Sequence, residues 1–158
     1  MSRAIDSILT GGDEVEIIIV NDGSKDETSR IGHEYEEKYP DIVKVVDKEN
    51  GGHGDAVNHG LTNATGKYFK VVDSDDWVNE EALQRILTVL RDMEEQDQEI
   101  DMLIANYVYE KEGAARKTVV HYRNVLPQDE VFGWSDVGSF HLGQYILLES
   151  LYEVLVNL

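Results

Sequence analysis

Along this chain, segments rich in apolar residues alternate at short intervals with segments whose apolar residues recur at helical spacing. Residues 15–20 and 68–72 have the composition of strands that are covered on both faces, and each ends in a cluster of polar and acidic side chains. Helical spacing follows each of them. Because strands that alternate with helices favour a parallel arrangement, the sequence predicts an α/β fold with a mixed, mainly parallel sheet.

Four helices are expected beside these strands. Ser24 and Glu27 form a capping-box pair at the start of the second helix, and Asn79 would cap the fourth. Gly66 is expected just beyond the end of the third helix, as its C′ residue. The apolar positions that would share one helix face lie within residues 4–9, 31–39, 56–64 and 83–93.

Further strand signals lie at 42–46, 102–109 and 118–122, and the last two favour an antiparallel pair across a turn at Gly113. Residues 142–158 are apolar enough for a helix or a strand, and their periodicity does not decide between the two. With 158 residues and no internal repeat, the chain is expected to form one domain, residues 1–158.

The net charge of the chain limits the classes of partner that it can bind. Its 32 Asp and Glu residues stand against 14 Lys and Arg residues, a formal net charge of -18. Broad charge attraction to a nucleic acid or to an anionic membrane surface is therefore not expected. The chain has no cysteine, which excludes disulfides and thiolate metal sites, and the expected compartment is the reducing cytoplasm.

Three carboxylates, Asp73, Asp75 and Asp76, follow the second apolar segment within four residues. Carboxylates this close repel one another, and a hard cation such as Mg²⁺ or Mn²⁺ would relieve the repulsion while leaving coordination positions for phosphate oxygens. The carboxyl end of a parallel strand is also where α/β sheets bind ligands. The alternative interpretation is a solvated acidic turn that caps the following helix.

The first apolar segment ends in Asn21-Asp22-Gly23-Ser24. Asp22 could accept a hydrogen bond from a base or a ribose, and Gly23 would let the backbone turn close to a ligand; the alternative is a plain strand-to-helix turn. A Gly-x-Gly-x-x-Gly motif is absent, and residues 60–67 have the wrong spacing and context for a P-loop, so a dinucleotide site and an ATPase loop are not supported. His53 and His59 flank a glycine-rich turn and are expected to be solvated or structural.

Taken together, these residues resemble the nucleotide-binding half of a family 2 glycosyltransferase of the GT-A fold. The resemblance covers roughly residues 15–90 and extends more loosely to about residue 145. It implies a three-layer α/β fold that is incomplete here, because the strand that precedes the first helix in the family is absent. The matching segments, in order and spacing, are residues 16–24, 49–52, 58–60, 64–68 and 73–77.

The resemblance implies an inverting, metal-assisted transfer of a sugar from a nucleotide diphosphate donor, usually linked to UDP, to a hydroxyl of a glycan or lipid-linked acceptor. By similarity Asp22 would bind the base and Asp75 the ribose, while Asp76, assisted by Asp73 or Asp75, would hold Mn²⁺ or Mg²⁺ as a DXD motif. The other residues that it places in the nucleotide site are Asn21, Gly23, Ser24 and Asn58.

Two positions depart from the family pattern. Val57 stands where the family often carries an arginine, and the carboxylate base that an inverting displacement needs has no matching motif, so Glu130 and Asp136 are only stand-ins. Two rival functions stay open: a nucleotidyltransferase, and a truncated, inactive module that binds nucleotide or forms homo-oligomers, with residues 145–156 covering the gap in the sheet. The complete enzyme would be cytoplasmic or peripheral at the inner face of the membrane.

Overall fold

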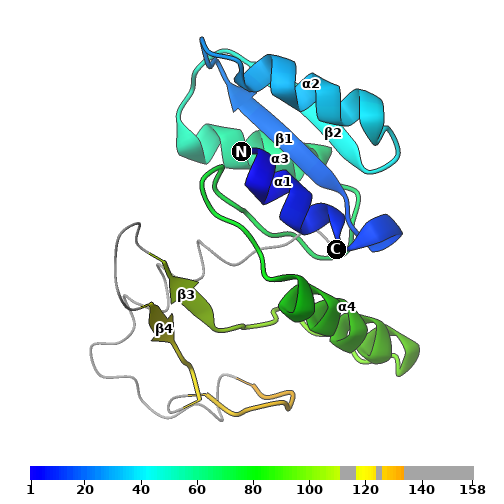
Figure 1. Ribbon diagram of the computed structural model, residues 1–158. Helices are drawn as coiled ribbons and strands as arrows, with labels where there is room; N and C mark the ends of the chain where they lie inside the picture. The colour runs from blue at the N-terminus through cyan, green and yellow to red at the C-terminus, as the bar shows by residue number, and fades with distance from the viewer. Residues whose placement is uncertain (111–116, 124–125, 134–158) are drawn as a thin grey trace. The chain divides into compact units, whose positions relative to one another are not determined.

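The computed structural model describes residues 1–110, 117–123 and 126–133, and these form two compact units, residues 1–97 and the described residues from 98 onward (Figure 1). The single domain expected over residues 1–158 stays a prediction. The segment 142–158 and the turn at Gly113 lie outside the described residues. Within the described part of the chain, no helix is both long enough and apolar enough to cross a membrane.

The first unit is built on two parallel strands, β1 (Ile17–Asp22) and β2 (Val43–Lys48), which lie side by side in Figure 1. Each strand ends two residues later in the chain than the sequence predicts. Their register places Asp22 directly opposite Lys48. Because parallel strands point the same way, both residues lie at the same edge of the sheet, and the predicted parallel pairing is confirmed.

Helices α1 (Ser2–Leu9) and α2 (Thr28–Lys38) cover one face of this pair. Ile5 of α1 forms a buried cluster with Ile17 of β1. Gly32 of α2 lies so close to the same face that a Cβ there would be 3.6 Å from the Ile19 side chain. Ile17 and Ile19 are two residues apart in a strand and therefore point to the same side, which places both helices in one layer.

Helix α3 (His53–Asn63) covers the opposite face. A Cβ at Gly60 would lie 3.6 Å from a Val20 methyl group, and Val20 points away from the side to which Ile19 points. The layered α/β arrangement expected from the sequence is thus confirmed in this unit. The helix ends at Asn63 with Ala64 extended, so the prediction that Gly66 follows the helix end as its C′ residue is wrong.

Helix α4 (Glu80–Glu95) matches its prediction closely. Asn79 accepts a hydrogen bond from the backbone N–H of Ala82 at 2.9 Å, as a capping residue does. Leu83 and Leu87 are buried against Val15, just before β1. A short 3₁₀ turn, η1 (Gly12–Glu14), leads from the end of α1 into β1.

The predicted capping box of α2 is wrong. The helix begins at Thr28, and Glu27 makes no side-chain cap. The backbone N–H of Ser24 donates instead to the side-chain oxygen of Asn21 at 3.1 Å, while Asp26 accepts from the N–H of Thr28 at 3.0 Å. Ser24 therefore belongs to the turn after β1, since that turn satisfies its backbone before the helix starts.

Residues 68–72 do not form the regular strand that the sequence predicts. Only Lys70 makes an isolated bridge. The segment is nonetheless packed inward, because a Cβ at Gly60 would lie 3.6 Å from the ring of Phe69. Its apolar residues are thus half-buried beside α3, and such packing alone does not establish a hydrogen-bonded strand.

In the second unit, β3 (Tyr107–Tyr109) pairs antiparallel with β4 (Thr118–Val120), with Val108 opposite Val119. The predicted antiparallel pair is confirmed, although both strands are shorter than expected. The backbone N–H of Tyr122 donates to the side chain of Asn106 at 3.0 Å, which continues the association of the two segments beyond the ladder.

Candidate functional site

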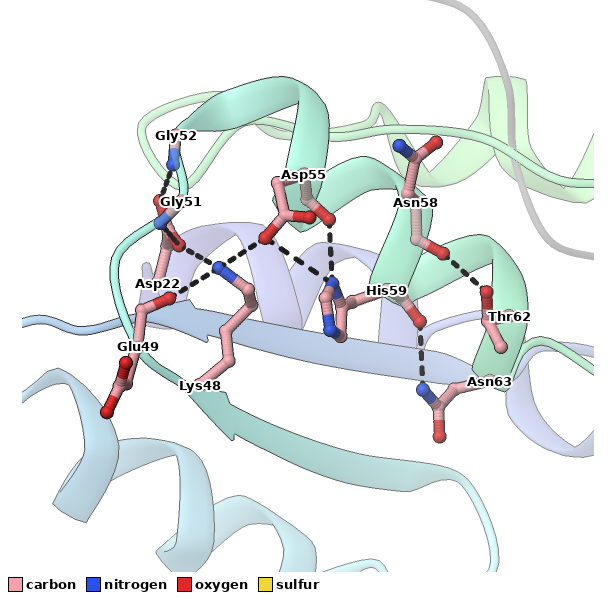
Figure 2. Close-up of polar contacts among 10 residues, drawn as sticks. All are labelled: Asp22, Lys48, Glu49, Gly51, Gly52, Asp55, Asn58, His59, Thr62 and Asn63. Atoms are coloured by element: carbon pink, nitrogen blue, oxygen red, sulfur yellow. Dashed lines mark hydrogen bonds and ion pairs between the residues drawn. The ribbon is translucent and has the colours of Figure 1, made fainter.

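The carboxylate of Asp22 is the centre of the site at the carboxyl end of β1. Its Oδ1 accepts hydrogen bonds from Lys48 Nζ and from the backbone N–H of Gly51 at 2.8 Å, and its Oδ2 accepts one from the N–H of Gly52 at 2.8 Å (Figure 2). The hydrogen bond from Lys48, followed by that from Gly51, lowers the pKa of Asp22. The group is therefore an ionised side chain that can only accept hydrogen bonds.

Lys48 is a cation that the sequence interpretation missed. Its side chain is only 9% exposed, and its Nζ contacts Asp22, the Asp55 carboxylate at 2.7 Å and the backbone oxygen of Glu49 at 2.6 Å. Hydrogen bonds to Asp22 and then to Asp55 raise the pKa of Lys48. Lys48 ends β2 just as Asp22 ends β1, so the two residues are paired in the parallel ladder. This pairing could have been predicted only if the register of the two strands had been known.

Two glycines of the site lie where a Cβ would collide with a neighbouring group. Gly23 has a φ of 72°, and a Cβ there would lie 2.8 Å from the backbone nitrogen of Asn50. At Gly51 a Cβ would collide with the Asp55 carboxylate and lie 2.9 Å from Lys48 Nζ. The expectation that Gly23 turns the backbone tightly is confirmed, although the group that it approaches is the neighbouring loop.

The side chain of Asn21 holds the turn after β1 through two hydrogen bonds. The residue is buried, its amide donates to Asp47 Oδ1 at 2.7 Å, and its side-chain oxygen accepts from the backbone of Ser24. Asp47 also accepts from Ser29 Oγ at 2.9 Å and pairs with His33 at 2.8 Å. Both ends of the Asn21 side chain are thus engaged within the protein, and its place in the nucleotide site stays a prediction.

Helix α3 carries three of the polar residues that the sequence singles out, His53, Asn58 and His59. Asn58 is exposed, and Figure 2 places its side chain on the far side of α3 from Lys48. His59 Nδ1 faces the backbone oxygen of Asp55 at 2.9 Å and the Asp55 carboxylate at 3.6 Å, so His59 has a structural partner. His53 is exposed at the start of the helix, in agreement with its expected solvated position.

The acidic segment Asp73-Ser74-Asp75-Asp76 is an exposed turn in which the N–H of Asp76 donates to the backbone oxygen of Asp73 at 3.0 Å. Partial burial raises the pKa of Asp76, and repulsion from Asp75 and then Asp73 adds to the rise. Within the described residues, no three acidic or histidine side chains are grouped to hold a metal ion. The oxygen ligands still suit Mg²⁺, which commonly uses one or two carboxylates together with substrate phosphates.

Helix α1 anchors the residues that follow this acidic turn. The guanidinium of Arg3 lies 3.1 Å from the centroid of the Trp77 ring, and the backbone N–H of Val78 donates to Ser7 Oγ at 3.1 Å. The sequence offered no signal for the pairing of Arg3 with Trp77. The two catalytic candidates remain predictions, because Glu130 is an exposed residue of the second unit and Asp136 lies outside the described residues.

Comparison with known proteins identifies the lineage of this arrangement. A family model for glycosyl transferase family 2 matches residues 1–128. The minor teichoic acid biosynthesis protein GgaB of Bacillus subtilis is 36% identical over 106 residues, which are 65% of this chain and 11% of GgaB. Glycosyltransferase GlyA of Streptococcus pneumoniae is 34% identical over 108 residues, 68% of this chain and 15% of GlyA.

An uncharacterized glycosyltransferase of Rickettsia prowazekii is 40% identical over 98 residues, 61% of this chain and 30% of that protein. The matched part is therefore less than a third of the length of each of these three relatives. The family model, in contrast, covers most of the chain, and its match includes both the end of β1 and the acidic turn at residues 73–76. The chain belongs to glycosyl transferase family 2, and its parallel α/β layers are a small and incomplete version of the GT-A fold of that family.

Proposed function

We propose that this chain is the donor-nucleotide half of a glycosyltransferase, which transfers a sugar from a UDP-sugar to a hydroxyl of a glycan or lipid-linked acceptor. The observation that carries the proposal is the ionised Asp22 carboxylate at the carboxyl edge of two parallel strands, where α/β sheets bind ligands. Membership of the family supports a nucleotide-sugar donor in general. The choice of UDP is part of the proposal.

Asp22 is suited to accept a hydrogen bond from the base of the donor. A carboxylate offers about four acceptor positions, and three donors of the described residues occupy Asp22. One acceptor position therefore remains on Oδ2, and it would take a ring N–H such as that of uracil. The Asp22 side chain is 22% exposed, so a ligand from solvent has access to it.

The diphosphate of the donor needs a cation beside it, because the chain has a net charge of -18. Asp76, with Asp73 or Asp75, would hold Mn²⁺ or Mg²⁺, and Asp75 would contact the ribose. A bound metal ion would supply charge neutralisation for the departing diphosphate. The exposed turn that carries these carboxylates leaves them open to both the ion and the phosphates.

Calorimetric titration of UDP, first in chelator and then in excess Mn²⁺, tests the proposal. We expect Mn²⁺ to strengthen binding, Asp76→Ala to remove that dependence without unfolding the protein, and Asp22→Ala to weaken UDP binding at either metal level. Asp41→Ala is a control with the same change in charge at an exposed site. Equal UDP affinity in chelator and in metal would refute the metal assignment, and an unchanged affinity in Asp22→Ala would refute the role of Asp22.

Turnover separates the proposed enzyme from its main rival, an inactive module that only binds nucleotide. An inverting displacement requires a carboxylate to take the proton of the acceptor hydroxyl, and Glu130 and Asp136 are the candidates for that base. We expect Glu130→Gln or Asp136→Asn to lower sugar transfer while leaving UDP binding unchanged. Nucleotide binding without transfer to any acceptor would favour the inactive module.

A further inference from the structure

We propose that Lys48 is a positioning residue of the nucleotide site, which holds the Asp22 carboxylate so that its free acceptor position on Oδ2 remains available to the base of the ligand. This inference rests on the proposed function, in which Asp22 binds that base. Lys48 itself would not touch the nucleotide. It would act through the carboxylate that it holds, as the contacts in Figure 2 suggest.

The contacts of Lys48 fix its ammonium group in three directions. An ammonium group has three N–H donors, and the three partners of Nζ are the Asp22 carboxylate, the Asp55 carboxylate and the backbone oxygen of Glu49. These partners come from the end of β1, from α3 and from the loop after β2. With its side chain only 9% exposed, Lys48 could contact a diphosphate only by giving up one of them.

The charges of the cluster give Lys48 a second effect on Asp22. The carboxylates of Asp22 and Asp55 both contact the same Nζ, so without that cation they would repel each other across the site. Repulsion would push Asp22 away from the backbone N–H groups of Gly51 and Gly52, which complete its hydrogen bonds. Removal of the cation should therefore change both the place of the carboxylate and the loop that surrounds it.

Titration of uridine and of UDP against two matched variants tests the proposal. Lys48→Met removes the cation, and Lys44→Met makes the same change of charge at an exposed position of the same strand. Uridine carries no phosphate, so it reports contacts to the base and ribose alone. We expect Lys48→Met to weaken both ligands to a similar degree, about tenfold, the effect of one charged hydrogen bond, and Lys44→Met to leave uridine affinity unchanged.

A double-mutant cycle with Asp22→Asn then shows whether Lys48 acts through Asp22. In the Asp22→Asn background, Lys48→Met should cause no further loss of uridine affinity, since the group that Lys48 positions has been altered already. Fully additive losses would overturn the proposal. A loss for UDP without a loss for uridine would also overturn it, because Lys48 would then be a ligand of the diphosphate.

Amide hydrogen exchange of the ligand-free protein tests the role of Lys48 independently of the proposed function. We expect the N–H groups of Gly51 and Gly52 to exchange faster in Lys48→Met than in the wild type or in Lys44→Met, and unchanged exchange would overturn the role of Lys48. If the wild type bound neither uridine nor UDP, the proposed function would fail, while the exchange result would still decide whether Lys48 holds Asp22. Should Lys48→Met not fold, Asp55→Asn removes one anchor of Lys48 and is expected to give the same changes in smaller degree.

Discussion

Gly23 offers the sharpest test of how closely the two loops of the site approach. Its φ of 72° lies in the left-handed region, and a Cβ at this position would lie 2.8 Å from the backbone nitrogen of Asn50 and 3.2 Å from the Asn50 Cβ. Gly23→Ala must therefore strain the backbone and also displace the neighbouring loop. That loop cannot shift freely, because Gly51 and Gly52 donate to Asp22.

Gly12 is the matched control for this substitution. Its φ is 62°, and a Cβ there would meet no atom within 4 Å. The left-handed conformation costs a residue with a Cβ about 1–2 kcal/mol, which the reduced freedom of the unfolded chain partly offsets. We therefore expect a loss of about 1 kcal/mol in the free energy of unfolding for Gly12→Ala.

Gly23→Ala bears the same backbone cost together with the collision. Forcing an extra methyl group into a packed site costs about 1–3 kcal/mol, so the expected total loss is about 2–4 kcal/mol. Urea unfolding monitored by circular dichroism at neutral pH measures both variants against the wild type. Equal losses for Gly12→Ala and Gly23→Ala would refute the close approach of the two loops, because only the shared backbone term would then remain.

Three further perturbations have defined outcomes. Leu87→Ala should lower the free energy of unfolding by about 2–5 kcal/mol in urea titration, because Leu87 is buried against Val15. Asn79→Ala should cost about 1 kcal/mol by the same assay, since it removes the side-chain cap of α4. Hydrogen bonds to Asp47 and then to Glu36 raise the pKa of His33 above its ordinary value of 6.5. The stabilisation by protonated His33 is therefore complete below pH 6.5 and lost as the pH rises through the raised pKa, so the thermal midpoint of His33→Gln should approach that of the wild type at high pH.

The sequence predicted best the elements whose signals are local. Helix α4 carries its cap, its acidic first turn and its apolar face within one continuous stretch, and the structure confirms all three. The start of α2 was missed because Ser24 resembles a cap in sequence, whereas the buried side chain of Asn21 takes the Ser24 N–H. That competition depends on how Asn21 is held by Asp47, a residue 26 positions away.

Residues 68–72 show a different limit. A short apolar run reports that a segment is buried, but a strand also needs a neighbour whose hydrogen-bonding groups match its own. Phe69 packs towards Gly60, but residues 68–72 are only half-buried, so the full burial of a central strand was predicted wrongly. Within the described residues, β1 forms its ladder with β2 alone. The composition of residues 68–72 does not show whether a neighbouring strand is available to pair with them.

In the candidate site, too, local patterns were predicted and long-range contacts were not. Asp22 was predicted from the sequence because an acidic residue at the end of an apolar strand is a local pattern. Lys48 was not found, because its role follows from the register that sets it opposite Asp22 and from the turn of α3 that brings Asp55 to the same ammonium group. A carboxylate that accepts from a lysine and two backbone N–H groups is held more firmly than a carboxylate in a plain solvated turn. The partners of Asp22 therefore decide how many further hydrogen bonds its carboxylate can accept.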